Sequence, residues 1–299
     1  NYTVTPAALQ GADGTGGIRV PLQISGTWAN PKYGLDVKAL ADQNFAKERD
    51  NLKARLQARE TLTGIWLSSG ASGLAELAGH AGFDWCLVDG EHTAQSITVM
   101  MPQLQALAST PTSAVVRIPA AEVWMVKQAL DIGAQAVLVP LVHDAEIATL
   151  MASAMRYPPD GIRGMGAAMA RASGFGAVTD YVHRANANAC LIVQAESRAA
   201  LDNIDAIAAV EGVDGVFIGP ADLSADMGYV GQPEHPDVDA AIAHIIARTH
   251  AAGKFSGVLT FNPDRIAHYR ALGVGFLGVG GDVAILGKAL RALAITARG

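Results

Sequence analysis

The chain has 299 residues, of which 50% are hydrophobic, so it is long enough to bury a large core. A formal charge of -6, a pI of about 5.7 and the absence of a lysine or arginine run exclude nucleic acid as an expected partner. No apolar run has the length of a bilayer span, and residues 1–5 lack the features of a signal peptide. The two cysteines, Cys86 and Cys190, lie inside apolar runs, which is typical of a reduced cytoplasmic protein.

The first 47 residues differ in pattern from the remainder of the chain. Residues 11–17 are rich in glycine and predict a flexible stretch, residues 18–26 predict a strand, and residues 37–60 predict one polar helix. The stretch 24–36 weakly resembles the C-terminal end of AsmA-type envelope proteins, but so short a match transfers no function. We interpret residues 1–47 as an extension of separate origin, fused to a second domain at 48–299.

From about residue 62 onward, short apolar runs alternate with helical patterns. The predicted strands are 62–68, 84–90, 113–118, 136–142, 189–195, 215–219, 255–261 and 275–279, and examples of the predicted helices are 122–133, 144–155, 199–210 and 236–252. Eight strand–helix units in sequence predict a closed parallel (β/α)8 (TIM) barrel. The alternative is a doubly wound sheet, which eight units of even size disfavour. In a barrel the active site forms from the loops that follow the strands.

Two carboxylates lie near the ends of neighbouring apolar strands. Glu196 closes the fifth predicted strand, and Asp222 follows the sixth. Two anions held close together at the barrel mouth favour a divalent cation between them, and an incomplete oxygen set suits Mg²⁺ or Mn²⁺. Zinc is disfavoured, because no histidine–cysteine cluster accompanies the pair. Asp222 could instead cap the helix that follows it.

A histidine and an arginine follow two other strands. His92 comes directly after the second strand and is either a general base or a hydrogen-bonded loop histidine. Arg117 lies inside the apolar third strand, where a guanidinium is costly unless it meets an anion. That anion is either a substrate oxygen, which we favour, or the carboxylate of a structural salt bridge with Glu91, Glu196 or Asp222.

A glycine-rich stretch at 157–166 follows the fourth unit. It is either an active-site loop or a structural Ω-loop, of which we favour the Ω-loop, with Arg163 and Arg171 facing the barrel mouth. No lysine lies at the C-terminal end of a predicted strand, so a Schiff-base mechanism has no candidate nucleophile. No serine or cysteine nucleophile elbow is present either.

Several motifs together resemble the HpcH/HpaI aldolases, which are class II pyruvate aldolases such as 4-hydroxy-2-oxo-heptanedioate aldolase. The motifs are residues 88–92, 115–117, 127–133, 156–164 and 213–224, and the resemblance covers about residues 48–299. The resemblance implies a (β/α)8 barrel, usually hexameric, that binds a divalent metal (Mg²⁺, Mn²⁺ or Co²⁺) and pyruvate.

The resemblance also implies roles for residues that bind the metal and pyruvate. The metal ligands of the family fall on Glu196 and Asp222, and the arginine that stabilises the enolate falls on Arg117. Gln194, which shares one strand face with Glu196, matches a glutamine near the pyruvate. The backbone around Ala221 and Asp222 matches the part that holds the pyruvate carboxylate.

The remaining roles concern proton transfer and the aldehyde. The catalytic histidine of the family falls on His92, with Asp89 beside it. The aspartate that polarises this histidine, contributed by a neighbouring subunit, falls on Asp131. Leu259 matches a residue that shapes the aldehyde pocket, and this region varies within the family, so the aldehyde stays open.

These residues predict a metal-dependent aldolase, which cleaves a 4-hydroxy-2-oxo acid reversibly to pyruvate and an aldehyde. The resemblance places it in aromatic-compound catabolism, as a cytoplasmic homo-hexamer with sites shared between subunits. One alternative is a citramalyl- or malyl-CoA-type lyase on the same barrel, although the sequence shows neither an added basic cleft nor a C-terminal lid. The other alternative is a non-catalytic binding barrel, which retention of the whole residue set disfavours.

Overall fold

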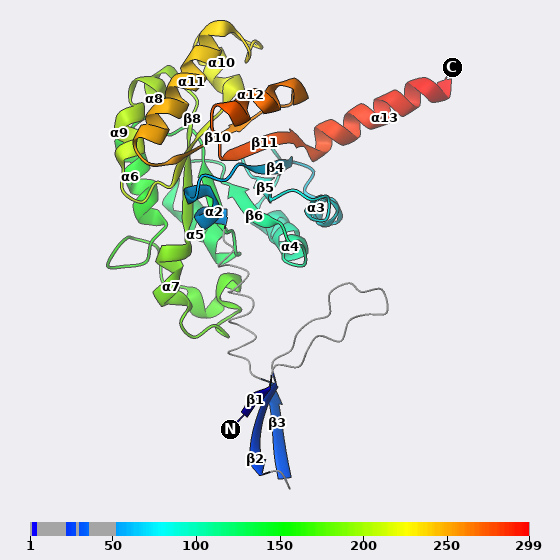
Figure 1. Cartoon of the computed structure of the whole chain (residues 1–299), viewed down its shortest axis with the longest axis vertical. Helices are drawn as coiled ribbons and strands as arrows, with labels where there is room; N and C mark the ends of the chain where they lie inside the picture. Colours follow the sequence, from blue (N-terminus) through cyan, green and yellow to red (C-terminus); the bar gives the residue numbers. More distant parts are fainter. Residues whose placement is uncertain (1, 5–21, 28–29, 36–51, 299) are drawn as a thin grey trace. The chain divides into compact units, whose positions relative to one another are not determined.

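The computed structural model describes residues 2–4, 22–27, 30–35 and 52–298, in two units, Asn1–Asp50 and Asn51–Gly299. In the first unit, the strands β1 (Tyr2–Val4), β2 (Leu22–Thr27) and β3 (Asn30–Leu35) form an antiparallel sheet in that order (Figure 1). The strand predicted at 18–26 is confirmed from residue 22 onward. Residues 18–21, and residues 37–51 of the predicted polar helix, lie outside the described residues.

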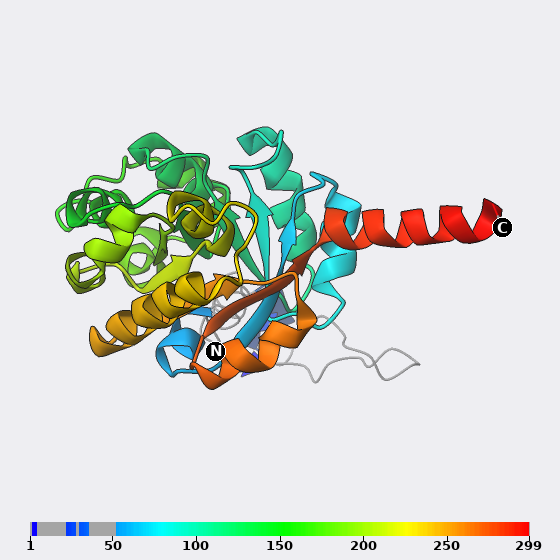
Figure 2. The same cartoon turned by 90° about the horizontal axis from the view of Figure 1, so that it is seen from above.

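In the second unit, eight parallel strands close into a barrel in the order β10-β11-β4-β5-β6-β7-β8-β9 (Figures 1 and 2). The strands are β4 (Leu62–Leu67), β5 (Trp85–Asp89), β6 (Ser113–Arg117), β7 (Ala136–Val139), β8 (Cys190–Ala195), β9 (Gly215–Ile218), β10 (Phe255–Leu259) and β11 (Phe276–Gly281). The predicted (β/α)8 barrel is confirmed, and the doubly wound alternative is wrong. The fourth strand ends three residues earlier than predicted, because Pro140 has no N–H for the strand ladder.

Helices follow the strands around the barrel. They are α2 (Leu52–Gln57), α3 (Ser72–Gly79), α4 (Ile97–Leu107), α5 (Val123–Asp131), α6 (Ala145–Ala154), α7 (Tyr181–Asn188), α8 (Arg198–Asp202), α9 (Ile204–Ala209), α10 (Pro220–Asp226), α11 (Pro236–Ala251), α12 (Ile266–Ala271) and α13 (Asp282–Arg298), with short 3₁₀ turns η1 (Ala167–Met169), η2 (Arg171–Ser173) and η3 (Pro263–Arg265). Three of the four predicted helices are confirmed to within two residues. The fourth, predicted at 199–210, is divided at Asn203, whose side-chain amide donates to His143 O.

The inside of the barrel is filled by large aromatic side chains. Trp85 stacks on Phe276 with ring centroids 3.7 Å apart, and Trp66 and Phe217 pack against this pair. Gly64 makes the stack possible, because a Cβ there would lie 2.0 Å from the Trp85 ring. The interior is therefore a packed core, and only the layer of side chains at the mouth is open to chemistry.

Helix α2 closes the barrel at the amino ends of the strands. Leu52 and Leu56 are buried in the same apolar cluster as Phe255 and Phe276, near the starts of β10 and β11. Lys53 Nζ donates to Ala189 O, which directly precedes β8. The described part of the predicted polar helix thus belongs to the barrel and contributes to its core.

Removal of residues 1–47 is expected to leave the barrel folded, because that cut retains α2. Removal of residues 1–57 would also delete Leu52 and Leu56, and each buried leucine side chain contributes about 1.5–3 kcal/mol. Thermal unfolding of the two truncated chains measures the difference. A 1–47 deletion as unstable as the 1–57 deletion would show that the extension supports the barrel.

Helix α13 extends away from the barrel in both Figure 1 and Figure 2, and none of its residues is buried. Val283, Leu286, Leu290 and Leu293 form one apolar stripe along it, with exposed fractions between 45% and 66%. The start of α13 is fixed, since the Asp282 carboxylate accepts hydrogen bonds from Ser68 N at 2.8 Å and Ser69 N at 3.2 Å. Among the described residues, none of the helices has both the length and the apolar character that a membrane crossing requires.

Candidate active site

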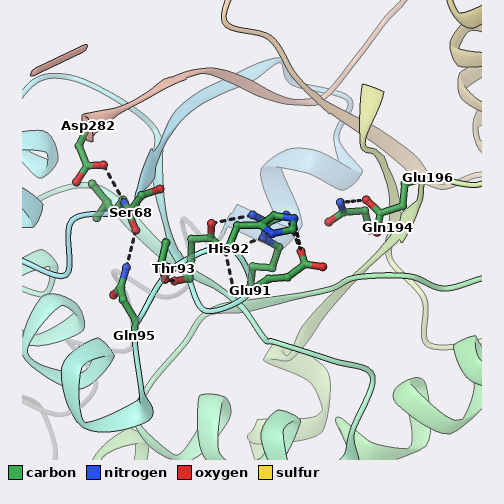
Figure 3. A network of polar contacts seen from close by, with 11 residues as sticks. Ser68, Glu91, His92, Thr93, Gln95, Gln194, Glu196 and Asp282 are labelled. Atoms are coloured by element: carbon green, nitrogen blue, oxygen red, sulfur yellow. Dashed lines mark hydrogen bonds and ion pairs between the residues drawn. The ribbon is translucent and has the colours of Figure 1, made fainter. Parts of the chain in front are cut away.

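The polar side chains predicted from strand ends gather at the carboxyl end of the barrel. Asp89 ends β5 and Arg117 ends β6, while Glu196 directly follows β8. Because all eight strands are parallel, their carboxyl ends open on one mouth. Figure 3 shows Gln194 and Glu196 facing each other at β8, and His92 beside Glu91 in the loop after β5.

Arg117 is buried and held by two carboxylates. Its Nε donates to Asp89 Oδ1 at 2.8 Å, its Nη2 donates to Asp89 Oδ2 at 2.7 Å, and its Nη1 lies 2.7 Å from Glu91 Oε2. The anions that compensate this guanidinium are therefore Asp89 and Glu91. The sequence analysis had named Glu91 as a possible salt-bridge partner, but not Asp89. A guanidinium has five N–H donors and Asp89 accepts from two of them, so donors remain for a substrate oxygen.

Glu91 links the arginine to the histidine, a role that the sequence analysis missed. Its Oε2 lies 3.7 Å from His92 Nε2, while the imidazole is 62% exposed. Burial raises the pKa of Glu91, against the opposing effect of Arg117 and His92, and the Asp89 and Asp222 carboxylates raise it further. The sequence could have indicated this role, because Glu91 lies between the end of the second predicted strand and the candidate base His92.

Glu196 is a buried carboxylate with both oxygens oriented. Leu141 N donates to Oε1 at 2.8 Å, and Gln194 Nε2 donates to Oε2. Burial raises the pKa of Glu196 to about 7, and the nearby Asp222 and Glu91 carboxylates act in the same direction. Gly219 leaves the room for this arrangement, since a Cβ there would lie 2.5 Å from Glu196 Oε2.

Asp222 lies in the first turn of α10 and is exposed, close enough to raise the pKa of Glu196. The alternative that Asp222 caps this helix is wrong, because the N-cap residue is Gly219. Within residues 52–298, the side-chain oxygen Oε1 of Gln194 is buried without a hydrogen-bond partner.

These oxygens fit a hard divalent cation. The described residues contain no group of three or more His, Cys, Asp or Glu side chains placed to hold a metal ion. Glu196 and Asp222 would thus be the only acidic ligands, with Gln194 Oε1 beside them. Mg²⁺ is commonly held by one or two carboxylates and keeps its remaining positions for water and substrate oxygens, so the set suits it.

The predicted site residues that remain are Ala221, Leu259 and Asp131. Ala221 is exposed beside Asp222. Leu259, the last residue of β10, is half-buried at the mouth and packs near Trp66, since a Cβ at Gly278 would touch both side chains. Trp66 was not among the predicted site residues, although its ring centroid lies 6.0 Å from the Arg117 guanidinium.

Asp131 lies at the opposite end of the barrel from His92. It is the last residue of α5, which starts near the mouth and runs for nine residues, or about 14 Å, toward the amino ends of the strands. Its Oδ1 is 2.7 Å from Arg163 Nη2. The structure therefore does not bring Asp131 and His92 together within one chain.

The glycine-rich stretch at 157–166 also lies at the amino ends of the strands, because it follows α6 and precedes β8. Of the two alternatives, an active-site loop of its own barrel is wrong, and so is the expectation that Arg163 and Arg171 face that mouth. Arg163 is buried against Tyr157, and Arg171 Nη1 donates to Ile132 O at 2.8 Å, just beyond the end of α5. A structural role for the stretch in its own chain agrees with these contacts.

Comparison with known proteins identifies the family. A model of the HpcH/HpaI aldolase/citrate lyase family matches residues 62–289. A hydroxypyruvate/pyruvate aldolase of Agrobacterium fabrum is 50% identical over 250 residues, covering 84% of this chain and 94% of that protein. A 4-hydroxy-2-oxo-heptane-1,7-dioate aldolase of Escherichia coli (strain ATCC 8739) is 47% identical over 245 residues, covering 82% and 94% respectively.

The solved structures agree with this result. The crystal structure of a HpcH/HpaI aldolase/citrate lyase family protein from Burkholderia cenocepacia J2315 matches with a TM-score of 0.79 at 39% identity, and the match covers 83% of this chain and 99% of that one. The predicted family and the predicted enzyme class are both confirmed. The chain belongs to the HpcH/HpaI aldolase/citrate lyase family and is a carbon–carbon lyase of the aldolase type.

Proposed function

We propose that this protein is a divalent-metal-dependent class II aldolase, which cleaves a 4-hydroxy-2-oxo acid of the heptanedioate kind reversibly to pyruvate and an aldehyde. The observation that carries the proposal is the buried, oriented Glu196 carboxylate at the same mouth as Arg117 and His92. The names of relatives at 47–50% identity, hydroxypyruvate/pyruvate aldolase and 4-hydroxy-2-oxo-heptane-1,7-dioate aldolase, support the substrate class.

Glu196 and Asp222 would hold the cation, which is Mg²⁺, Mn²⁺ or Co²⁺. A divalent cation bound there supplies a Lewis acid for the keto oxygen and for the enolate that C3–C4 cleavage leaves. Gln194 orients Glu196 through its amide N–H and retains a buried carbonyl oxygen at the site. The backbone at Ala221 and Asp222, in the first turn of α10, would hold the pyruvate carboxylate by its N–H groups.

Arg117 and His92 would act on the substrate itself. Asp89 and Glu91 fix the guanidinium plane of Arg117, so its remaining donors are oriented before the substrate arrives. His92 is exposed at the mouth and would take the proton of the 4-hydroxyl group when the C3–C4 bond breaks. Leu259 would line the aldehyde side of the pocket, near Trp66.

Arg117→Lys is expected to fold but to lose much of its rate, because a lysine keeps the charge and loses the fixed fork of donors. Removal of one such stabilising donor typically costs ~2.7–4 kcal/mol, or ~10²–10³-fold in kcat. Steady-state kinetics of the variant, with thermal unfolding as the control for folding, measure the effect. A kcat near that of the wild type would mean that Arg117 serves only as an ion-pair partner of Asp89 and Glu91.

The active site would be shared between copies of the chain, in a homo-hexamer. Asp131 lies at the opposite end of its own barrel from His92, so it can polarise only the His92 of another copy. The exposed apolar stripe of α13 supports the association of copies, because burial of such a surface is the main favourable contribution to protein assembly.

The domain boundary and the cellular setting are part of the same proposal. Residues 48–299 would form the aldolase domain, with residues 1–47 as an added unit. We place the enzyme in the cytoplasm and in aromatic-compound catabolism, where a diacid of the 4-hydroxy-2-oxo-heptanedioate kind would be its substrate.

The test of the proposed function is retro-aldol cleavage by the purified full-length chain. Pyruvate release from 4-hydroxy-2-oxo-heptanedioate, measured with a coupled lactate dehydrogenase reaction in the presence of Mg²⁺, is the expected result. Malyl-CoA and citramalyl-CoA are the comparison substrates. Cleavage of a CoA thioester in place of the free acid would assign the lyase of the alternative, and no cleavage of either class would favour a binding barrel.

A further inference from the structure

Asp131 is held by one of the most deeply buried charged side chains of the barrel unit. The Arg163 side chain is 1% exposed, its Nη2 lies 2.7 Å from Asp131 Oδ1, and the same nitrogen donates to Tyr181 Oη at 3.3 Å. The Tyr157 ring lies under the guanidinium, 4.3 Å from its carbon to the ring centroid. Arg163 thus fixes one oxygen of the Asp131 carboxylate, and Tyr157 and Tyr181 hold the guanidinium in place.

The second oxygen of Asp131 is accessible. The side chain is 26% exposed, and no residue within 52–298 makes a hydrogen bond or ion pair to Oδ2. Gly166 lies next to it, since a Cβ at this glycine would stand 3.8 Å from Oδ2. Because Gly166 has no side chain, the approach to Oδ2 stays open at that point.

We propose that Arg163 is a positioning residue of the shared active site: it fixes Oδ1 of Asp131 and so orients Oδ2 toward the His92 imidazole of a second copy of the chain. This inference rests on the proposed function, in which Asp131 polarises that histidine. Arg163 would not touch substrate itself. It would act only through Asp131, on the reaction in the barrel of the neighbouring copy.

The contacts explain why an arginine is required at this position. A guanidinium can donate to a carboxylate and a phenol from one nitrogen while its plane stacks on an aromatic ring. A lysine has a single flexible ammonium, which keeps the charge but does not fix the carboxylate plane. Loss of a partner that orients a metal-binding side chain typically costs ~10–100-fold in activity, and we expect a loss of that size for Arg163.

A structural explanation competes with this inference. A buried guanidinium needs an anion, so Asp131 could serve only to neutralise Arg163. The two explanations differ in where a lesion at Arg163 acts. If Asp131 only neutralises Arg163, the lesion destabilises its own chain, whereas in our inference it disables the half of the site that the chain presents to its neighbour.

Subunit mixing separates these outcomes. Arg163→Lys mixed with His92→Ala should recover activity, because the His92→Ala copy supplies an intact Arg163 and Asp131 to the His92 of the other copy. Arg163→Lys mixed with Asp131→Ala should recover none, because both changes lie in the same half of the site. Native mass spectrometry verifies that the subunits exchange. In unmixed Arg163→Lys, kcat is expected to fall ~10–100-fold while KM stays unchanged.

Controls keep the test independent of folding. Arg171→Lys changes a nearby arginine that is half-buried. Arg171 donates to Ile132 O and Leu104 O and not to Asp131, so this variant should retain its kcat. Gly166→Leu leaves Arg163 in place but covers Oδ2, so it should behave like Arg163→Lys in every mixture. Gly166→Ala is its matched control, since the added Cβ makes only an ordinary contact and the φ of −123° there suits any residue.

The outcomes distinguish the inference from the function on which it rests. If His92→Ala and Asp131→Ala fail to complement each other although exchange is confirmed, the shared site is wrong and the inference falls with it. If that pair complements but Arg163→Lys keeps its kcat, or complements Asp131→Ala, the role of Arg163 alone is overturned. Should Arg163→Lys fail to fold, Tyr181→Phe takes its place in the same mixtures, because it removes the phenol oxygen to which Arg163 Nη2 donates and leaves Asp131 unchanged. Full kcat in Tyr181→Phe, or complementation of Asp131→Ala by it, would then overturn the role of Arg163.

Discussion

Removal of divalent cations with EDTA is expected to abolish cleavage, and addition of Mg²⁺, Mn²⁺ or Co²⁺ is expected to restore it. The chain offers no alternative electrophile at the mouth, because no lysine lies at the carboxyl end of a strand in residues 52–298. Without a cation, the buried Glu196 carboxylate has only the unfavourable charges of Asp222 and Glu91 near it, and burial disfavours its ionised form further. Pyruvate release at a range of EDTA and cation concentrations measures this dependence.

Cation binding is also expected to stabilise the fold, and more so at higher pH. Burial raises the pKa of Glu196 to about 7 from an ordinary value of 4.5, so between these values the folded chain holds a proton that the unfolded chain releases. The stability of the cation-free protein therefore falls as the pH rises through that window. Competition between the proton and the cation therefore decreases as the pH rises past about 7. A cation present at 100-fold excess over its Kd contributes about 2.7 kcal/mol to stability.

Thermal unfolding with and without Mg²⁺, at pH 6 and pH 8, measures this stabilisation. The shift in Tm should be larger at pH 8 and absent in Glu196→Gln.

Trapping of a pyruvate adduct with borohydride would contradict the metal-dependent mechanism, because it would reveal a Schiff base. Cleavage that persists in the absence of any divalent cation would contradict it equally.

His92→Ala and Asp131→Ala are each expected to lose ~10²–10⁴-fold in kcat, the usual effect of losing a general base. His92 is exposed, and its sole charged contact within residues 52–298 is Glu91 at 3.7 Å, so a carboxylate from outside the chain has access to the imidazole. An ionised Asp131 there would orient the ring and favour its protonated form. Steady-state kinetics of each variant alone give these losses.

Mixing the two variants then identifies the source of the carboxylate. Under conditions of subunit exchange, a copy with His92 can meet a copy with Asp131, and part of the activity should return. Arg117→Lys provides the control, since its lesion lies in the same half of the site as His92 and should not complement His92→Ala. With exchange confirmed by mass, a mixture that stays inactive would mean that Asp131 has no role at His92.

The barrel and much of the mouth could be predicted from the sequence. Strand and helix periodicity are local properties, so the eight units from 62–68 to 275–279 were all identified to within three residues at either end. The same reasoning placed Asp89, Arg117 and Glu196 at strand ends, because the end of an apolar run is visible in the sequence. Family resemblance then supplied the roles of these residues, which a strand pattern by itself does not contain.

Only the tertiary structure decided which side chains meet. The pairing of Arg117 with Asp89 depends on the register of β5 against β6, which joins residues 28 positions apart. The contacts of Arg163 with Asp131 and with the Tyr157 ring likewise join separate segments, and they reversed the prediction that Arg163 faces the mouth. Side chains distant in sequence meet through strand register and helix direction, and periodicity carries information about neither, because it reports only on contacts within one element.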